Sequence, residues 1–385
     1  MRGARPLGLH YTGTLSTQIG NSMQKKNQRR LGLIAGLALV GVAFGTIPAF
    51  ADPAAGTYAQ LSGTGSDTTQ DLVGGLSTAV TAIGNYDATG TETIQTKSGG
   101  PSFLRPNGSG NGVKALSASI NSTGIKVWNS VDITGQLDFA RSSSGPKGSG
   151  SDLTYIPFAK DAVTYAVNAG GSFPRDIPIG SSSQDSVSPA PFTLRNIYRC
   201  AVTEYADADF NTVAIRALLP QSGSGTRSFW LSTLGLTETD VASCATDIGN
   251  TVQEHSGAQV TGIGDIVPFS IAQYVAQGNH NTLPTTVLER RYQVALGSIG
   301  GSKPVINNDG VVELNSAFPI SRNVYNVVAT SRLSGTSAAD LLLQATFAGT
   351  SSTVCSNTAL IKQYGFGSAG TLCGNTTTYK SPYTL

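Results

Sequence analysis

Apolar and polar positions along the chain repeat with two periods, one typical of helices and one of strands. Residues 71–83 place their apolar side chains at the spacing of one helical face. Short apolar runs predict strands at 162–167, 213–219 and 324–329. Further helices are expected at 114–120, 194–200, from 228 onward, at 271–277 and at 338–348. Strands that alternate with helices predict an α/β protein with largely parallel sheets.

Three loops rich in Gly, Ser and Thr each lead into a predicted helix. They are Gly63–Gln70, Asn107–Val113 and Gln221–Arg227. Such a junction presents backbone N–H groups and hydroxyls at the positive end of a helix, which suits an anion. A plain loop, or an N-cap role for Ser66 and Asp67, is the alternative for any one of them. Because ligands of open α/β sheets bind beyond the carboxyl ends of strands, we expect the three loops to converge there.

A fourth polar segment, Leu137–Gly145, carries a single arginine, Arg141, among serines. A guanidinium offers a planar fork of donors that matches an oxyanion. An ordinary surface arginine is the alternative. We expect Arg141 to balance the charge of a bound anion.

The N-terminal segment has the pattern of an export signal. Basic residues precede an uncharged apolar run from Leu31 to Ile47, and Ala49-Phe50-Ala51 offers a small-x-small cleavage site. We expect residues 1–51 to be an upstream extension plus signal peptide, so that the mature chain starts near Asp52. A membrane anchor is the alternative to cleavage. Met23 is a second candidate start, and no cysteine stands at the cleavage point to carry a lipid.

Removing this segment changes the charge of the chain. Residues 1–51 hold six of the 25 Lys and Arg residues and none of the 23 Asp and Glu residues. The mature chain therefore has 19 basic and 23 acidic residues and a net charge of −4. This balance removes the support for a broad nucleic-acid surface. Its 334 residues are enough for two lobes, each with its own core.

Four cysteines remain, and no cluster of metal ligands accompanies them, so neither a metal nor another cofactor is expected. An even number of cysteines in an exported protein predicts disulfides, with free buried thiols as the alternative. Three pairings are possible. We favour Cys200–Cys244 with Cys355–Cys373, because this pairing keeps each bridge within one predicted lobe.

These segments together resemble the substrate-binding proteins of ABC phosphate transporters, of the type II periplasmic-binding-protein superfamily. The resemblance covers most of the mature chain, and the motifs follow the family's order. They are Gly-Ser-Asp-Thr-Thr at 65–69, Gly-Ser-Gly-Asn-Gly-Val at 108–113, Asp-Phe-Ala-Arg-Ser-Ser at 138–143, Ser-Gly-Ser-Gly-Thr at 222–226 and Gly-Ser-Ile-Gly at 297–300. The resemblance implies a two-lobed fold with two mixed, largely parallel sheets and a hinge. Lobe one would comprise 52–160 and 317–385, and lobe two 161–316.

The resemblance also implies that phosphate or a similar small oxyanion binds between the lobes. The family's ligand aspartate falls at Ser143 and the arginine opening its third loop near Pro220, so Arg141 and Arg227 would have to compensate. Without the acceptor aspartate the site loses a repulsion that rejects fully ionised oxyanions, so the ligand need not be phosphate. The expected ligand-binding residues are Ser66, Asp67, Thr68, Ser109, Arg141, Ser142, Ser143, Ser222, Ser224, Gly225, Thr226 and Arg227.

We therefore expect a secreted or cell-envelope solute-binding protein, monomeric and not an enzyme, which passes its anion to an ABC permease. It would meet the membrane only through that transporter and would bind no nucleic acid. One alternative is a structural or adhesive protein that keeps the fold without binding an anion. The other is a serine hydrolase, with Ser224 as nucleophile and His255 or His280 as base. Ser222 occupies the Gly position of a G-x-S-x-G motif, and both histidines are interpreted as exposed.

Overall fold

The computed structural model describes residues 52–120, 124 and 127–384. The chain divides into the units Met1–Ile47 and Pro48–Leu385, and all described residues belong to the second. The predicted signal peptide lies outside the described residues. No helix in the described ranges is long and apolar enough to cross a membrane.

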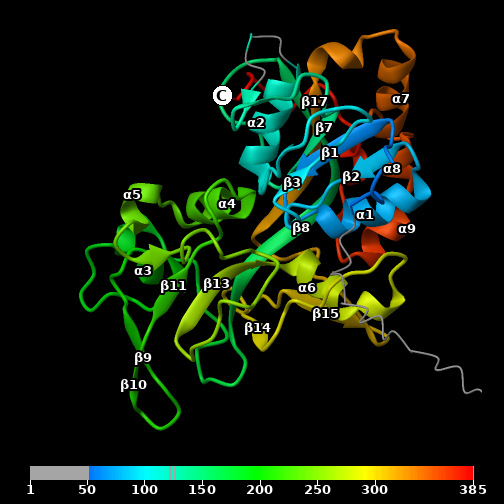
Figure 1. The fold of residues 1–385 in the computed structure, drawn as a ribbon. Coiled ribbons are helices and arrows are strands. Elements are labelled where there is room, and N and C mark those ends of the chain that lie inside the picture. The colour runs from blue at the N-terminus through cyan, green and yellow to red at the C-terminus, as the bar shows by residue number, and fades with distance from the viewer. Residues whose placement is uncertain (1–51, 121–123, 125–126, 385) are drawn as a thin grey trace, which may run out of the picture. The chain divides into compact units, whose positions relative to one another are not determined.

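Among the described residues, eleven strands form one mixed sheet (Figure 1). Its main path runs β12-β11-β13-β8-β17-β7-β1-β2, and β14, β18 and β19 also pair with β8. The mixed α/β class is thus confirmed. The expected two, largely parallel sheets are instead one sheet with more antiparallel than parallel pairs, because the long strand β8 runs through both parts and pairs antiparallel with its neighbours. The strands are β1 (Leu61–Gly65), β2 (Ile83–Asn85), β7 (Phe139–Ser142), β8 (Leu153–Asn168), β11 (Arg216–Leu218), β12 (Ala245–Thr246), β13 (Asp265–Ser270), β14 (Val294–Leu296), β17 (Ser321–Ala329), β18 (Gly367–Ser368) and β19 (Lys380–Ser381).

The long strand β8 joins the two ends of the sheet. Its first part pairs antiparallel with β17, from Leu153 opposite Ala329 to Ala162 opposite Ser321. Its last part pairs antiparallel with β13. Parallel pairs lie toward the two ends, where β1 joins β2 and β7, and β11 joins β12 and β13. Nearly every residue of β8 is buried, as expected for a strand covered on both faces.

Helices cover the sheet (Figure 1). Four two-stranded hairpins lie outside the main sheet in the described part of the chain. The helices are α1 (Gln70–Ala79), α2 (Ser109–Ile120), α3 (Leu194–Tyr198), α4 (Gly225–Leu234), α5 (Glu238–Val241), α6 (Ile271–Gly278), α7 (Ala338–Phe347), α8 (Thr353–Ser356) and α9 (Thr358–Gln363). The hairpin strands are β3 (Thr93–Ile94), β4 (Phe103–Leu104), β5 (Val127–Trp128), β6 (Val131–Asp132), β9 (Glu204–Ala206), β10 (Thr212–Ala214), β15 (Val305–Asn308) and β16 (Val311–Leu314).

Several predicted elements have different bounds in the structure. The helix expected over 71–83 ends at Ala79, because Ile83 leaves the helix and pairs with Leu61 in β1. The strand expected over 213–219 is two strands, β10 in a hairpin with β9 and β11 in the main sheet. The helix expected from 114 already starts at Ser109, so the second glycine-rich loop forms its first turn.

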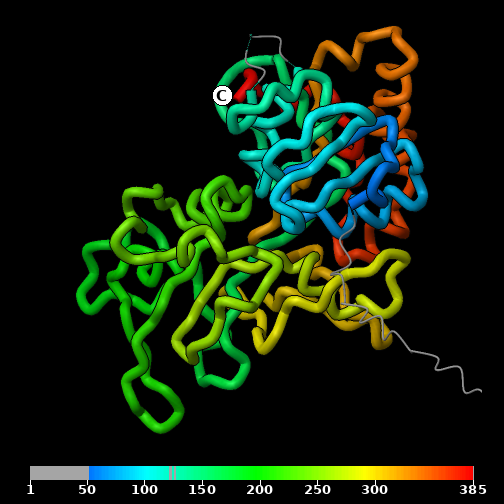
Figure 2. The backbone as a smooth tube through the Cα atoms, in the orientation of Figure 1, coloured from blue at the N-terminus to red at the C-terminus, as the bar shows by residue number. Residues whose placement is uncertain are grey.

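The hydrophobic cores largely follow the predicted lobes. Two clusters draw on residues 61–159 and 324–366, and two on residues 162–320. Figure 2 shows the blue and cyan N-terminal part of the chain lying beside the orange and red C-terminal part, whereas the green and yellow middle forms the other part. Ala272 and Ala276 of α6 and Val287 are exceptions, because they pack into a lobe-one cluster. The lobe boundaries themselves stay a prediction.

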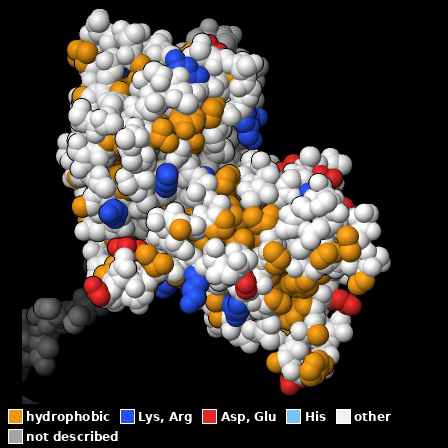
Figure 3. Space-filling view, turned by 180° about the vertical axis from the view of Figure 1, so that it is seen from behind, with side chains coloured by type: hydrophobic (Ala, Val, Ile, Leu, Met, Phe, Trp, Pro, Cys, Tyr) orange, Lys and Arg blue, Asp and Glu red, His pale blue; other side chains and the backbone are white. Residues whose placement is uncertain are grey.

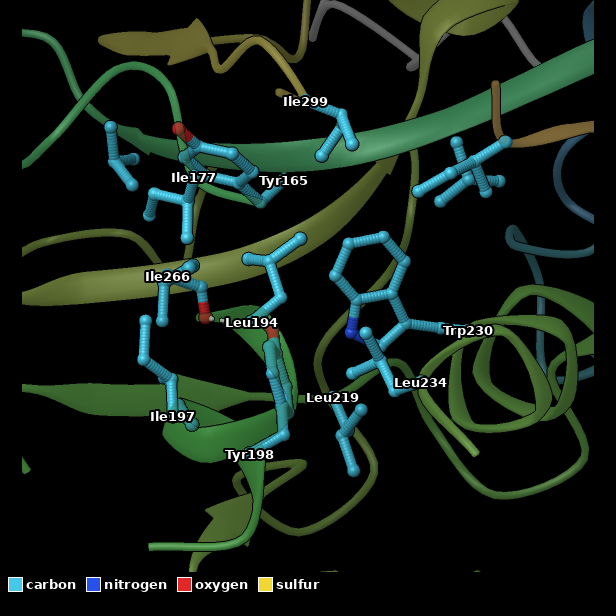
Figure 4. Close-up of a cluster of buried hydrophobic side chains, with 14 of the residues drawn as sticks. Tyr165, Ile177, Leu194, Ile197, Tyr198, Leu219, Trp230, Leu234, Ile266 and Ile299 are labelled. Atoms are coloured by element: carbon cyan, nitrogen blue, oxygen red, sulfur yellow. Dashed lines mark hydrogen bonds between the residues drawn. The ribbon is translucent and has the colours of Figure 1, made fainter. Parts of the chain in front are cut away.

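Helix α4 is fixed by an aromatic core beneath it. Trp230 is fully buried and packs edge-on against Tyr198 of α3, with ring centroids 5.8 Å apart. Figure 4 shows Trp230 and Leu234 facing the cluster that contains Tyr165, Leu219 and Ile266. This packing holds the first turn of α4 in place.

Both preferred disulfides are confirmed. Cys200 bonds to Cys244, and Cys355 bonds to Cys373. The first connects the end of α3 to the start of β12, and the second connects α8 to the turn before β19. Each bridge joins residues of one predicted lobe.

Candidate functional site

The structure brings the three predicted loops together. The N–H of Gly110 donates to the carbonyl of Gly223 at 2.9 Å. The side chain of Gln221 donates to Asn107 at 3.1 Å. The hydroxyls of Thr68 and Thr226 lie 3.3 Å apart. The first two loops belong to the predicted lobe one and the third to lobe two, so these contacts join the two parts of the sequence.

A cavity of about 330 Å³ lies where the first turns of α2 and α4 meet. Six serines line it, and two lysines, Lys114 and Lys147, contribute its charge. Tyr155 and Val113 add an apolar side. No carboxylate is among its lining residues in the described part of the chain. The cavity therefore combines hydroxyl donors, two ammonium groups and the positive ends of two helices, all of which favour an anion.

Most backbone N–H groups of the loops are already used inside the protein. The Ser224 hydroxyl caps α4 by accepting from the N–H groups of Thr226 and Arg227. The N–H of Ser222 donates to Asn250, and that of Ser143 to the Ser109 hydroxyl. The expected cradle of backbone donors is therefore largely occupied. Hydroxyls and lysine ammonium groups remain as the main donors toward the cavity.

Behind the cavity lies a buried carboxylate, Glu254, which sequence reasoning missed. Its Oε1 accepts hydrogen bonds from the hydroxyls of Thr68 at 2.8 Å and Thr226 at 2.7 Å. Its Oε2 accepts from the Ser224 hydroxyl at 2.8 Å. The side chain is fully buried. Three hydroxyls predicted to bind an external anion thus bind a carboxyl of the same chain.

An ion pair supports this cluster from the crossing strands. Arg322 of β17 contacts Asp161 of β8 at 2.8 Å and donates to the Thr226 hydroxyl at 2.7 Å. Both charged side chains are almost fully buried. Burial raises the pKa of Asp161, and the charge of Arg322 opposes this rise. The available sequence signal was the single acid of β8, which stands among mostly apolar residues, because a buried acid needs a partner.

His255 and Asp67 form a second buried pair. Their Nδ1 and Oδ2 atoms lie 3.1 Å apart, and both side chains are buried. Burial, followed by the charge of Arg290, lowers the pKa of His255 to about 3, so the ring is neutral and its Nδ1–H donates to Asp67. The expectation that His255 is exposed is wrong, because it packs against the first loop. Ser224 donates to Glu254 and not to a histidine.

A carboxyl pair links Asp67 to Glu254. Both carboxyls are buried, and the negative charge of Asp67 disfavours ionisation of Glu254. Burial raises the pKa of Asp67. Burial, followed by the negative charge of Asp67, raises the pKa of Glu254 to about 7. Near neutral pH, we expect the pair to share one proton.

The two arginines expected at the ligand lie elsewhere. Arg141 is fully buried and donates to the backbone carbonyls of Ser66 and Tyr86 and to the side chain of Asn85. Burial lowers its pKa to about 10, so it stays charged at neutral pH. Arg227 is bound by Glu238 and Asp247. Neither arginine lines the cavity, because protein acceptors hold both guanidinium groups.

The predicted ligand residues therefore separate into three sets. Those that line the cavity are Ser109, Ser142, Ser222, Ser224 and Gly225. Those that are buried outside its lining are Ser66, Asp67, Thr68, Ser143 and Thr226. The two arginines form the third set. In the described ranges no group of three or more His, Cys, Asp or Glu side chains could hold a metal ion. On the face shown in Figure 3, Lys and Arg side chains are scattered and form no basic stripe.

Solved structures similar to this chain include substrate-binding proteins of phosphate transport. One is described as a phosphate ABC transporter substrate-binding protein with bound phosphate from Clostridium perfringens (12% identity, 80% of this chain and 99% of that chain, TM-score 0.49). Another is an ABC-type phosphate transport receptor from Vibrio cholerae (14%, 80% and 99%, 0.45). A third is a phosphate-binding protein from Stenotrophomonas maltophilia (15%, 81% and 91%, 0.42).

No protein-family model matches the chain, and no curated protein matches it either. These three structures are 12–15% identical to this chain. Its function therefore has to be inferred from the site itself.

Proposed function

We propose that this protein is a secreted solute-binding protein that captures phosphate or a similar small oxyanion for ABC-type uptake. The observation that supports it most is the cavity at the first turns of α2 and α4, lined by serines, Lys114 and Lys147 and by no carboxylate. A volume of about 330 Å³ lies at the small end of ligand pockets, roughly 300–1,000 Å³. A small ligand with one or two negative charges fits this chemistry.

The binding mechanism follows from where the donors come from. Ser109 and Lys114 lie on α2, whereas Ser222, Ser224 and Ser228 precede or belong to α4. Lys147 reaches across and donates to the Ser228 hydroxyl at 3.1 Å. An anion that takes donors from both helices would hold the two predicted lobes together and favour a closed state. We propose that the monomeric closed form is the one an ABC permease recognises.

The test is a thermal-unfolding series on residues 52–385, dialysed free of phosphate. Phosphate, sulfate, arsenate and sugar phosphates are added at matched ionic strength. A ligand at 100 times its Kd stabilises the fold by about 2.7 kcal/mol. With roughly 2.1 cal/mol/K of unfolding entropy per residue over about 330 residues, this raises Tm by about 4 °C.

Two lysine variants locate the site. Lys114→Gln and Lys147→Gln should each weaken binding roughly tenfold or more, because a charged hydrogen bond contributes about 1.5–3 kcal/mol. Lys303→Gln is the matched control, since Lys303 is exposed and does not line the cavity. An equal loss of anion affinity in all three variants would indicate non-specific electrostatic attraction and would refute the proposed binding site.

A second function has one observation in its favour. The carboxyl of Glu254 already accepts hydrogen bonds from the hydroxyls of Thr68, Ser224 and Thr226. A structural or adhesive protein that needs no external anion could be built in this way. Absence of a Tm response to every anion in the series would favour this alternative.

A further inference from the structure

We infer that Glu254 fills a buried pocket for a small carboxylic acid, which lies beside the cavity proposed above and shares only the Ser224 hydroxyl with it among the described hydroxyl donors to Glu254. Its carboxyl takes the place that an external acid would occupy. The inference does not rest on the proposed function, because the contacts of Glu254 that define the pocket exist whether or not an anion binds in the cavity.

The contacts of Glu254 are those of a bound ligand. Three hydroxyls reach its two oxygens at 2.7–2.8 Å, one from the loop after β1 and two from the start of α4. The donors lie 186, 30 and 28 positions away in sequence. Glu254 itself lies between β12 and β13, in no helix or strand. A loop side chain therefore joins donors from both predicted lobes.

Charged neighbours surround the pocket on the remaining sides. Arg322 donates to two of the three hydroxyls, Thr226 at 2.7 Å and Thr68 at 3.3 Å, and so turns their protons toward Glu254. Asp161 accepts from Nε and Nη2 of Arg322. Nη1 of Arg322 and Oδ1 of Asp67 are buried and have no hydrogen-bond partner among the described residues.

The unpartnered Oδ1 of Asp67 determines the protonation state in which an acid can occupy the pocket. A second carboxyl can lie against Asp67 only when one proton is shared between them. Neutral His255 holds the other Asp67 oxygen, and beyond it lies the ion pair of Arg290 with Asp71. The pocket therefore suits an acid that arrives with a proton for Asp67, such as a short carboxylic acid.

Shortening Glu254 should empty the pocket without removing its walls. Glu254→Ala deletes four heavy atoms, the Cγ, the Cδ and both carboxyl oxygens, and acetate has the same four. We expect acetate to bind in the variant and restore its stability. Glu238→Ala is the matched control, since Glu238 is a carboxylate of an exposed helix end bound to Arg227.

The experiment measures thermal unfolding of the exported protein at pH 6 in sodium acetate and in sodium chloride of equal ionic strength. We expect Tm of Glu254→Ala to rise saturably with acetate, by about 4 °C at 100 times Kd. The unaltered protein and Glu238→Ala should not respond. At pH 8, acetate should bind more weakly, by up to tenfold for each pH unit, because the shared proton is lost. Lys114→Gln added to Glu254→Ala should leave the acetate response unchanged, which separates this pocket from the cavity.

Glu254→Gln keeps the inference testable if the alanine variant folds poorly. The amide fills the same volume, so acetate should have no effect on it. An alanine variant that folds only in acetate would support the pocket. Three results would overturn it: a folded alanine variant that ignores acetate, an alanine variant that folds in neither salt while the glutamine variant folds, or a glutamine variant that responds as strongly as the alanine variant.

Discussion

Replacing Arg322 by Met tests whether the crossing strands depend on their buried ion pair. Arg322 is the cation that contacts Asp161, and that acid is fully buried. Within the described part of the chain, its other hydrogen bonds come from the Ser270 hydroxyl and the N–H of Ala272. Removing the guanidinium leaves a buried carboxylate without a counter-charge. Breaking such a pair from one side costs about 3–5 kcal/mol.

The expected change in Tm follows from the size of the chain. Unfolding entropy of roughly 2.1 cal/mol/K per residue over about 330 residues gives about 0.7 kcal/mol/K. Arg322→Met should therefore lower Tm by about 4–7 °C. The Met side chain can still pack on the Phe229 ring that the guanidinium now faces at 5.3 Å, so lost packing contributes little.

Calorimetry of three variants decides the matter. Asp161→Asn combined with Arg322→Met should be more stable than Arg322→Met alone, because no unpaired charge remains. Arg199→Met is the control, since Arg199 forms a partly exposed 3.7 Å pair with Asp185 and should cost about 1 kcal/mol or less. The reasoning is refuted if Arg322→Met costs no more than this control, or if the double variant is as unstable as the single one.

Three further predictions concern stability. The pKa of Glu254 is raised from 4.5 to about 7, so the folded state holds a proton that the unfolded state has released. The free energy of unfolding should therefore fall as pH rises from about 4.5 to 7. Glu254→Gln should not show this fall, so the difference between the urea-unfolding free energies of the two proteins should change over this pH range. Replacing Cys200 and Cys244 by Ser together should cost about 4 kcal/mol in the loop-entropy model for their separation of 44 residues, and an unchanged urea midpoint would contradict this. Arg141→Met should lower the free energy of unfolding by at least about 3 kcal/mol, because it leaves the acceptors on Asn85 and Tyr86 without a donor. If the variant instead keeps its stability and binds anions more weakly, Arg141 contacts the ligand and this prediction is wrong.

The sequence predicted the elements that local pattern determines. Helices α4, α6 and α7 and strand β17 lie within a few residues of their expected positions, because apolar spacing and capping residues act over short distances. Both disulfides were also predicted, since export and an even count restrict the choices. The errors at Ile83 and Ile215 arose where a partner strand, not the local pattern, decided the conformation. Leu61 pairs with Ile83, and the Thr203 carbonyl accepts the N–H of Ile215.

The candidate site was less accessible to sequence reasoning, and its chemistry explains why. Glycine- and serine-rich loops predict hydroxyl donors, and a buried donor needs an acceptor. The sequence predicts that an acceptor is needed, but it does not identify the acceptor, because a bound ligand and a side chain distant in sequence can both supply a carboxylate or similar oxygen.

Ser224 illustrates the point, since it lines the cavity and also donates to Glu254. A hydroxyl has one proton to donate. An anion in the cavity and the carboxylate of Glu254 must therefore compete for it. Protonation of Glu254 weakens its hold on Ser224 and favours the anion. The buried acid thus bears on what the neighbouring cavity can bind, although no motif in the chain marks it.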